Sequence, residues 1–344
     1  MRKRGICAVC LALLLTGCGS DSAKTAYEKG VTALQAGEYE TAVQAMDEVI
    51  GQEYRLPEAY RIQGIASLQL GDYPEAIASL QRSLNALDMS NASFERDTLY
   101  YLAEARNAYG EPARAIEIYD ELLGREEEWQ AYFLRGKTYF KLEEYEKARE
   151  DFERAVENSK DTDLYIQIYQ LYKGTSLEKD GTDFLEKALQ IRDETAEGYY
   201  NRGRVYYYLQ EYEKAEDELT QAMDQGKPEA MLLLGRVYLV KKVVDGARQM
   251  YQQALEKEEK MDQAYNGLAL CDIAEENYDG ALEQIQKGLQ SEGGTARQQL
   301  LYNEIIVYER RLDFETAREK MESYLAVYPD DEEAQREAQF LESR

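Results

Sequence analysis

Few side chains in this sequence are placed to do chemistry. Histidine, the commonest general base and the commonest metal ligand, does not occur among the 344 residues. Acidic residues are abundant, and runs such as 126–128 and 330–333 are typical of solvated helix ends rather than of paired catalytic carboxylates. No phosphate-binding glycine loop, cysteine pair or calcium-loop spacing is present. The sequence therefore predicts neither an enzyme nor a metal or cofactor site, and binding is the function left to explain.

The charge balance narrows the class of partner. The chain has 67 Asp and Glu residues against 41 Lys and Arg residues, which gives a formal net charge of −26. A body this acidic repels phosphate backbones, so we expect no nucleic acid partner. Tyrosine is the conspicuous aromatic, with 29 residues, and its side chain combines a large contact area with a polar tip. We expect a protein or peptide ligand that is basic or neutral overall.

The beginning of the chain predicts export. Basic residues 2–4 precede an apolar run at 6–15, which is too short to cross a bilayer because a spanning helix needs about 20 residues. The run ends in the sequence LTGC at residues 15–18, which resembles the bacterial lipobox. That resemblance implies that residues 1–17 are a lipoprotein signal peptide and that the thiol of Cys18 receives a diacylglycerol. The alternative is an ordinary signal peptide in which cysteine happens to follow glycine.

The lipobox interpretation also predicts a location. Residues 18–23 would be the lipidated cysteine and a short linker, and the protein would touch the membrane through its lipid anchor only. We expect it at the outer face of the bacterial cytoplasmic membrane, or at the outer membrane if the source has one. Cys271 is then the one cysteine of the folded part, so no internal disulfide is expected. A buried thiol acting as a small hydrophobe is the expected role for Cys271.

The rest of the chain repeats one unit. Residues 196–227 contain two apolar-periodic runs that predict two short helices folded back on each other, with Gly203 in the first and Ala215 in the second. Small residues at these positions let two helices approach closely. The same pair recurs as Gly30 and Ala42, Gly64 and Ala76, Gly136 and Ala148, and Gly235 and Ala247.

This pattern resembles the tetratricopeptide repeat, whose period is about 34 residues. The resemblance implies an all-α, right-handed α-solenoid of about nine helix-turn-helix repeats with a C-terminal capping helix. The first four repeats would occupy 24–160, a degenerate fifth repeat 161–195, the sixth to ninth repeats 196–330 and the capping helix 331–344. The fifth repeat has Ile168 and Asp180 at its small positions, which predicts either a longer turn or a bend there.

Resemblance to these arrays also implies that the first helix of each repeat lines a concave groove. The inward positions in this register include Tyr100, Phe133, Lys137, Phe140, Tyr165, Tyr169, Tyr172, Tyr200, Arg204, Tyr207, Leu232 and Arg236. The expected groove is aromatic with scattered cations, and its centre is expected near Tyr200, Arg204 and Tyr207. The alternative for any single tyrosine is packing against a neighbouring helix. Trp129, the only tryptophan, is expected to pack rather than to contact a ligand.

Some arrays of this family hold the C-terminal carboxylate of a peptide with inward lysines and asparagines of three consecutive repeats. Only Asn201 occupies such a position here, because Tyr165, Tyr169, Glu229 and Leu233 stand at the others. We therefore reject a carboxylate clamp. The prediction is a membrane-anchored scaffold that binds a protein or extended peptide and supports the assembly of an envelope complex. The alternative is a carbohydrate-binding surface lipoprotein that uses the same aromatic groove.

Overall fold

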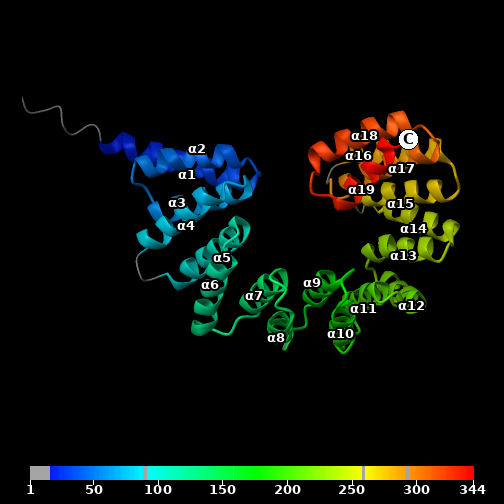
Figure 1. Cartoon of the computed structure of the whole chain (residues 1–344), viewed down its shortest axis with the longest axis horizontal. Coiled ribbons are helices and arrows are strands. Elements are labelled where there is room, and N and C mark those ends of the chain that lie inside the picture. Colours follow the sequence, from blue (N-terminus) through cyan, green and yellow to red (C-terminus); the bar gives the residue numbers. More distant parts are fainter. Residues whose placement is uncertain (1–15, 88–90, 158, 258–259, 292–293) are drawn as a thin grey trace, which may run out of the picture. The chain divides into compact units, whose positions relative to one another are not determined.

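A computed structural model describes residues 16–87, 91–157, 159–257, 260–291 and 294–344. These residues form nineteen helices and no strand (Figure 1). They divide into two compact units, an N-terminal unit that ends at Ser159 and a C-terminal unit from Lys160 to Arg344. The all-α architecture expected from the repeat pattern is therefore confirmed.

The helices of the N-terminal unit are α1 (Thr16–Gln35), α2 (Tyr39–Gly51), α3 (Leu56–Gln69), α4 (Tyr73–Ala86), α5 (Ala92–Tyr109), α6 (Pro112–Arg125), α7 (Trp129–Lys141) and α8 (Tyr145–Val156). Those of the C-terminal unit are α9 (Thr162–Tyr172), α10 (Glu178–Ala188), α11 (Ala196–Tyr208), α12 (Tyr212–Asp224), α13 (Glu229–Val240), α14 (Val244–Glu256), α15 (Met261–Ala274), α16 (Tyr278–Gln290), α17 (Arg297–Arg310), α18 (Phe314–Val327) and α19 (Glu332–Glu342). Within each unit, a helix packs mainly on the next helix along the chain (Figure 1). Odd-numbered helices also contact the next odd-numbered helix, as α13 contacts α15. The odd-numbered helices are thus the first helices of successive repeats, and they form one row in each unit.

The small residues lie where the two helices of a pair come closest, as their spacing predicts. A Cβ atom added to Gly203 in α11 would lie 2.6 Å from Cγ of Leu219 in α12, which is closer than any real contact of this kind. Alanines of the second helices have no exposed surface: Ala42, Ala76, Ala115, Ala148, Ala215, Ala247, Ala281 and Ala317. Close packing of the two helices in each pair is therefore confirmed.

A short turn joins the two helices of most pairs and contains one residue with positive φ. Glycine fills this position in the early repeats, as at Gly71 with φ of 77°. Later repeats place larger residues there, such as Lys242 at 61° and Leu312 at 62°. Residues with a Cβ atom are disfavoured in this left-handed region, so these turns are held by the helices on either side.

The fifth pair, α9 and α10, departs from the others. Five residues, 173–177, separate its helices, where three residues separate α11 from α12. Of the longer turn and the bend predicted for the fifth repeat, the longer turn is present. The placement of Asp180 at the small position is wrong, because the close contact is made by Gly181, whose added Cβ would lie 2.6 Å from Cβ of Tyr172.

Helix α19 closes the C-terminal unit, as expected for a capping helix. Asp331 begins it by accepting a hydrogen bond from the backbone N–H of Ala334, at 3.1 Å. Ala334 and Leu341 are buried in one cluster with Met321 and Tyr324 of α18. The apolar face of the last repeat is therefore covered.

Candidate functional site

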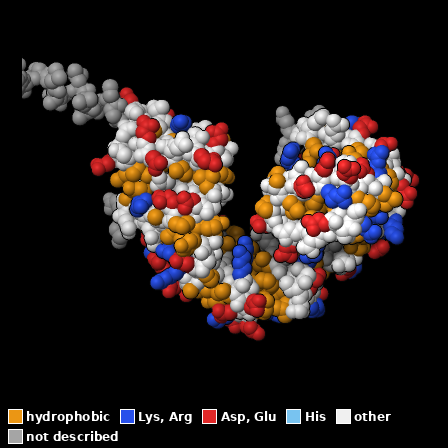
Figure 2. Space-filling model, turned by 45° about the horizontal axis from the view of Figure 1, so that its top comes forward, with side chains coloured by type: hydrophobic (Ala, Val, Ile, Leu, Met, Phe, Trp, Pro, Cys, Tyr) orange, Lys and Arg blue, Asp and Glu red, His pale blue; other side chains and the backbone are white. Residues whose placement is uncertain are grey.

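The N-terminal unit has a groove of about 990 Å³ along its first helices. Side chains of α3, α5 and α7 provide most of its lining, and Tyr100 and Lys137 are among them, as the repeat register predicted. Charges of both signs line it: Arg61, Arg96, Asp97, Glu104, Glu127, Glu128, Lys137 and Lys141. Figure 2 shows apolar side chains exposed in bands between charged ones on this unit. The groove is therefore suited to a ligand with mixed character rather than to a single charged group.

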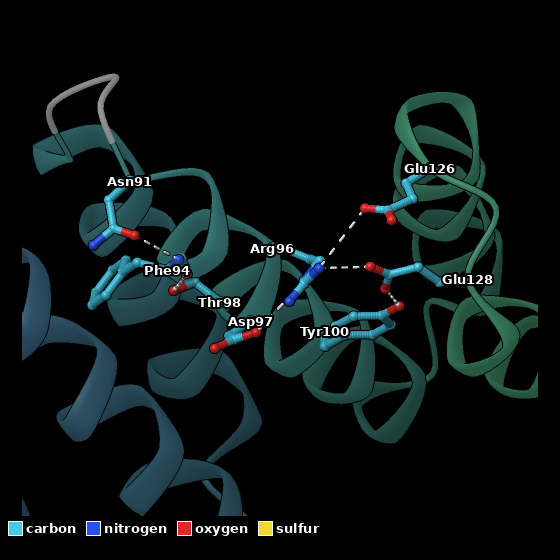
Figure 3. A network of polar contacts seen from close by, with 8 residues as sticks. All are labelled: Asn91, Phe94, Arg96, Asp97, Thr98, Tyr100, Glu126 and Glu128. Carbon is cyan, nitrogen blue, oxygen red and sulfur yellow. Dashed lines mark hydrogen bonds and ion pairs between the residues drawn. The ribbon is translucent and has the colours of Figure 1, made fainter.

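A polar network fixes one wall of this groove (Figure 3). Arg96 in α5 forms an ion pair with Glu128, which precedes α7, at 2.6 Å between Nη1 and Oε1. The hydroxyl of Tyr100 donates a hydrogen bond to the other oxygen of Glu128 at 2.8 Å. Burial, and then the hydrogen bond to Glu128, raise the pKa of Tyr100. The Tyr100 hydroxyl therefore stays protonated and donates its hydrogen bond within the protein. Its ring is the part that remains available to a ligand in the groove.

Two buried phenylalanine rings of the same unit lie beside cations that line the groove. The guanidinium of Arg61 lies 3.9 Å from the ring centroid of Phe94, and Nζ of Lys137 lies 5.6 Å from that of Phe133. Trp129 is 52% exposed and lines the groove. Trp129 begins α7 and is not buried by packing as expected, because half of its surface stays exposed in the groove.

Cavities of about 120 and 550 Å³ lie along the first helices of the C-terminal unit. Tyr207 of α11 and Arg236 of α13 line both of them, so the two cavities adjoin; we call them together the C-terminal groove. Its lining comes mainly from the row of first helices α11, α13, α15 and α17. All five of the inward residues predicted for these helices line it: Tyr200, Arg204, Tyr207, Leu232 and Arg236.

One end of the C-terminal groove is built around Tyr200. The guanidinium of Arg204 lies 5.6 Å from the centroid of its ring and Nζ of Lys227 lies 5.4 Å from it. Arg204 also forms an ion pair with Asp163, and Lys227 forms one with Glu197. Burial raises the pKa of Tyr200, against the opposing effect of Arg204. These two cations are thus already satisfied within the protein.

The other end carries amide and hydroxyl groups. Asn303 in α17 donates a hydrogen bond from Nδ2 to Oδ1 of Asn266 in α15, at 2.8 Å. Gln298 donates to the hydroxyl of Tyr324 at 3.0 Å, and that hydroxyl donates to Asp331 at 2.5 Å. Burial and the bond to Asp331 raise the pKa of Tyr324 to about 12. This end therefore presents neutral groups beside the carboxylates of Asp331 and Glu333, and the bond from Tyr324 lowers the pKa of Asp331.

Sequence models of the tetratricopeptide repeat match three segments of the chain, two at residues 27–92 and 200–259 and one at residues 129–161. Each segment contains helix pairs whose first helices line one of the grooves. The chain is a tetratricopeptide repeat protein.

This tetratricopeptide repeat protein has relatives of low identity. It is 22% identical to the BBSome complex member BBS4 homolog of Drosophila melanogaster, over 67% of this chain and 50% of that protein. It is 24% identical to Hsp70-Hsp90 organizing protein 2 of Arabidopsis thaliana, over 80% of this chain and 47% of that protein. The chain thus spans about half the length of these curated relatives. A solved tetratricopeptide repeat protein from Parabacteroides merdae is 14% identical, with a TM-score of 0.46 over 72% of this chain and 98% of that one.

Two side chains of α7 that were predicted to face the groove pack within their own repeat instead. Phe133 is 7% exposed, and its ring centroid lies 6.1 Å from that of Phe152 in α8. Phe140 packs edge-on against Tyr145, with 5.1 Å between centroids. The placement of these two phenylalanines in the groove is therefore corrected.

The three tyrosines of α9 are also buried rather than exposed in a groove. Tyr165 is 5% exposed, Tyr169 2% and Tyr172 1%. Gly181 in α10 leaves room for two of them, since Tyr172 and Tyr169 are the residues that an added Cβ would meet. Tyr172 also stacks on Phe184 of α10. In this pair the large side chains come from the first helix and the small residue from the second. The tyrosines of α9 therefore pack against a neighbouring helix, which was the alternative to lining the groove.

Several lining residues were not predicted, although the repeat period contains a signal for them. Asn266 follows Leu232 by 34 residues, one repeat period, and Gln299 follows Asn266 by 33; both line the C-terminal groove. Glu128 of the N-terminal groove carries no such signal, because it precedes a helix and is held in place by its contacts with Arg96 and Tyr100.

The predicted export signal lies mostly outside the described residues. Residues 1–15 are not described, and neither is the side chain of Cys18. Helix α1 begins at Thr16, so the positions expected to form the linker, 18–23, lie in its first turns. None of the helices formed by described residues is both long and apolar enough to span a bilayer. Cys271 is fully buried, and burial raises the pKa of its thiol to about 11, which fits a small hydrophobe.

Proposed function

We propose that this protein is a scaffold that binds an extended segment of a partner protein along its grooves. Tetratricopeptide repeat proteins use the surface of their stacked first helices for binding. The observation that carries the proposal is the C-terminal groove, in which Tyr207 and Arg236 join two cavities along four successive first helices. A row of adjoining subsites suits an extended chain better than a compact small molecule.

The chemistry of the C-terminal groove also favours a polypeptide. Amide side chains offer a donor and an acceptor on one group, and an extended peptide needs both because each residue presents an N–H and a C=O. Asn266, Gln298 and Asn303 line the groove and provide such groups. Tyrosine rings between them provide apolar contact area. Binding rather than catalysis is the function that these groups support.

We further propose that a lipid on Cys18 holds the scaffold and its partner at a membrane. The basic residues 2–4, the apolar run at 6–15 and the sequence LTGC at 15–18 support this part. The scaffold would then work at the outer face of a bacterial membrane, where it would support the assembly of an envelope complex.

A site-specific photo-crosslinker tests the binding surface. The probe is placed at Gln299, an exposed residue of the C-terminal groove, in the full chain expressed in its own cells. The matched control carries it at Glu213 in the second helix α12, where the side chain is 82% exposed. We expect the Gln299 probe to capture a partner polypeptide that the Glu213 probe does not. Equal capture at both positions, or none at Gln299, would contradict the proposal.

A further inference from the structure

An exposed tryptophan is the most prominent feature of the N-terminal groove. Trp129 begins α7, and 52% of its surface is exposed where it lines the groove. The rings of Tyr100 and Tyr101 in α5 and the side chain of Leu134 line the same groove. Trp129 is therefore part of an apolar surface in a hollow, which is typical of a binding site. Tryptophan is also among the residues that contribute most to the binding energy of protein interfaces.

The backbone at Trp129 is held in place within the protein. Glu128, the residue before it, is fixed against α5 by the ion pair with Arg96 and by the hydrogen bond from Tyr100 (Figure 3). Both contacts cross from one repeat to the next, so they determine where α7 begins relative to α5. The indole itself has only two rotatable side-chain bonds, so little conformational entropy is lost when a ligand covers it.

The unpaired cations of the N-terminal unit gather in the same groove. Among the described residues of this unit, four basic side chains form no ion pair: Lys29, Arg61, Lys137 and Lys141. All of these except Lys29 line the groove. The other cations of the unit find a carboxylate, as Arg96 does, in a chain with 67 acidic and 41 basic residues. The groove therefore keeps positive charges that the protein itself does not neutralise.

The charges of the groove are separated along α7. Glu127 and Glu128 precede the helix, and Glu128 is already paired with Arg96. Lys137 and Lys141 lie on its second half, at least about 12 Å further along the helix axis at a rise of about 1.5 Å per residue. This separation exceeds the Debye length of about 8 Å at physiological salt. The two carboxylates before the helix therefore do little to neutralise the lysines.

We propose that the N-terminal groove is a second binding site, for a partner segment that carries an aromatic or large aliphatic side chain and, close to it, an aspartate or glutamate. Trp129 and Tyr100 contact the apolar side chain, and Lys137 and Lys141 bind the carboxylate. Charge-assisted hydrogen bonds are about twice as strong as neutral ones, so the lysines select an acidic residue over its amide. This inference rests on the proposed function and adds a second segment, with its own chemistry, to the one that the C-terminal groove binds.

The charge of the whole molecule limits how acidic this segment can be. The formal net charge of −26 repels a strongly acidic ligand. Two further carboxylates line the groove: Asp97, which pairs with Arg96, and Glu104, which forms no ion pair within the described chain. A segment with one acidic residue among neutral ones therefore fits both the groove and the molecule.

A displayed library of random twelve-residue peptides tests the site. Each peptide is flanked at both ends, so that no terminal carboxylate is available, and selection uses the full chain. Peptides that bind the wild type and are lost on Trp129→Ala report this groove, because truncating a central tryptophan should weaken binding about thirtyfold. We expect these peptides to share an aromatic or large aliphatic residue and an Asp or Glu.

Substitutions on both sides of the interface then test the lysines. In one selected peptide, made with capped ends, Glu→Gln should weaken binding about fivefold to the wild type and less than about twofold to the double variant Lys137→Gln with Lys141→Gln. The double variant Lys137→Glu with Lys141→Glu should reverse the preference, so that the Glu→Lys peptide binds more tightly than the Glu peptide. A groove that had only lost its shape would bind neither peptide.

A matched control separates the site from the charge of the whole molecule. Lys24→Gln with Lys29→Gln makes the same charge change at two exposed lysines of α1 that do not line the groove, and it should keep the full preference for Glu. Circular dichroism checks that each variant is folded. A preference for Glu that survives Lys137→Gln with Lys141→Gln would overturn this inference and leave the proposed function standing.

The selection also distinguishes failure of this inference from failure of the proposed function. Peptides that depend on Trp129 but show no acidic preference, or the absence of any peptide lost on Trp129→Ala, would overturn this inference alone. If no selected peptide is lost on Tyr200→Ala with Gln299→Ala either, the proposed function is contradicted as well.

Discussion

Tyr119 and Tyr251 occupy the same place in two repeats but differ in what surrounds their hydroxyls. Asn107 lowers the pKa of Tyr119 against the larger effect of burial, whereas the buried hydroxyl of Tyr251 has no hydrogen-bond partner among the described residues. A satisfied buried hydroxyl stabilises a protein, and an unsatisfied one destabilises it. The two tyrosines therefore form a natural pair for comparing these effects on one scaffold.

Replacing each tyrosine with phenylalanine should have opposite effects on the isolated protein. We expect Tyr251→Phe to raise the free energy of unfolding by about 1 kcal/mol, because it removes an unpaired donor and keeps the ring, and Tyr119→Phe to lower it by about 1 kcal/mol. Urea denaturation of both variants measures the difference. A loss of stability in Tyr251→Phe would mean that its hydroxyl has a partner in the free protein.

The sequence predicted which single residues face the grooves only where the repeat keeps its ordinary geometry. Tyr200, Arg204 and Tyr207 are correctly placed because Gly203 and Ala215 fix how α11 is rotated against α12. Tyr169 and Tyr172 are wrongly placed because Gly181 moves the small residue to the second helix. Sequence spacing cannot reveal that exchange, since either arrangement lets the two helices approach.

At the scale of elements, the turn between paired helices carries a repeated strain. Leu312 has φ of 62°, and its side chain is 74% exposed, so it gains little from packing. Gly71 stands at the corresponding turn of an earlier repeat with φ of 77°, and an added Cβ there would meet nothing within 4 Å. The cost of a side chain at this position is therefore a cost of backbone conformation alone.

We expect Leu312→Gly to stabilise the protein by about 1 kcal/mol, because glycine adopts positive φ without a steric penalty. Gly71→Ala should destabilise it by about the same amount. Thermal unfolding followed by circular dichroism measures both variants. If the two substitutions shift the midpoint in the same direction, backbone strain is not what distinguishes these turns.

A partly buried carboxylate in α17 makes the C-terminal end sensitive to pH. One oxygen of the Glu309 carboxylate is buried without a hydrogen-bond partner in the described chain. Burial, with a smaller contribution from Glu337, raises the pKa of Glu309 from 4.5 to about 7, and Arg310 opposes the shift. Between pH 4.5 and 7 the folded protein therefore keeps a proton that the unfolded chain has released. Stability from this group is greatest below pH 4.5, falls as pH rises to 7 and is constant above it.

Glu309→Gln should remove this dependence. At pH 8 we expect the variant to unfold a few degrees above the wild type, because a neutral amide replaces a buried charge, and at pH 4.5 we expect nearly equal midpoints. The same substitution at Glu315, which is exposed on α18, serves as the control and should change neither midpoint. A gain at pH 4.5 as large as that at pH 8 would argue against titration of Glu309.

The helix pairs themselves were predictable, because a small residue in each helix at a constant period specifies both the pairing and the stacking. The polar wall of the N-terminal groove, formed by Arg96, Tyr100 and Glu128, could not be predicted from the sequence. Glu128 lies outside a helix, and its role depends on where the ends of α5 and α7 meet, which no period along the chain encodes. Long side chains that reach across repeats escape prediction from spacing for this reason.

At the scale of the whole molecule, the predicted anchor would set where the grooves work. If Cys18 carries a lipid, the full chain should sediment with membranes and incorporate a labelled fatty acid. We expect Cys18→Ser to abolish the label and to release the protein from the membrane fraction, because two acyl chains bind a bilayer far better than none. Cys271→Ser is the matched control, since this thiol is buried in the folded part, and it should keep the label. Equal labelling of Cys18→Ser and wild type would exclude the anchor at this position.

The stacking of each helix on its nearest neighbours has a consequence for how the chain is made. Extensive contacts join residues that are close in the sequence, and folds dominated by such contacts form quickly. A polypeptide crossing a membrane emerges one end first, and a stack of this kind can nucleate on whichever repeats have emerged. If this chain is exported as proposed, each completed helix pair would offer a surface on which the next can fold while the remainder of the chain is still in the translocation pore.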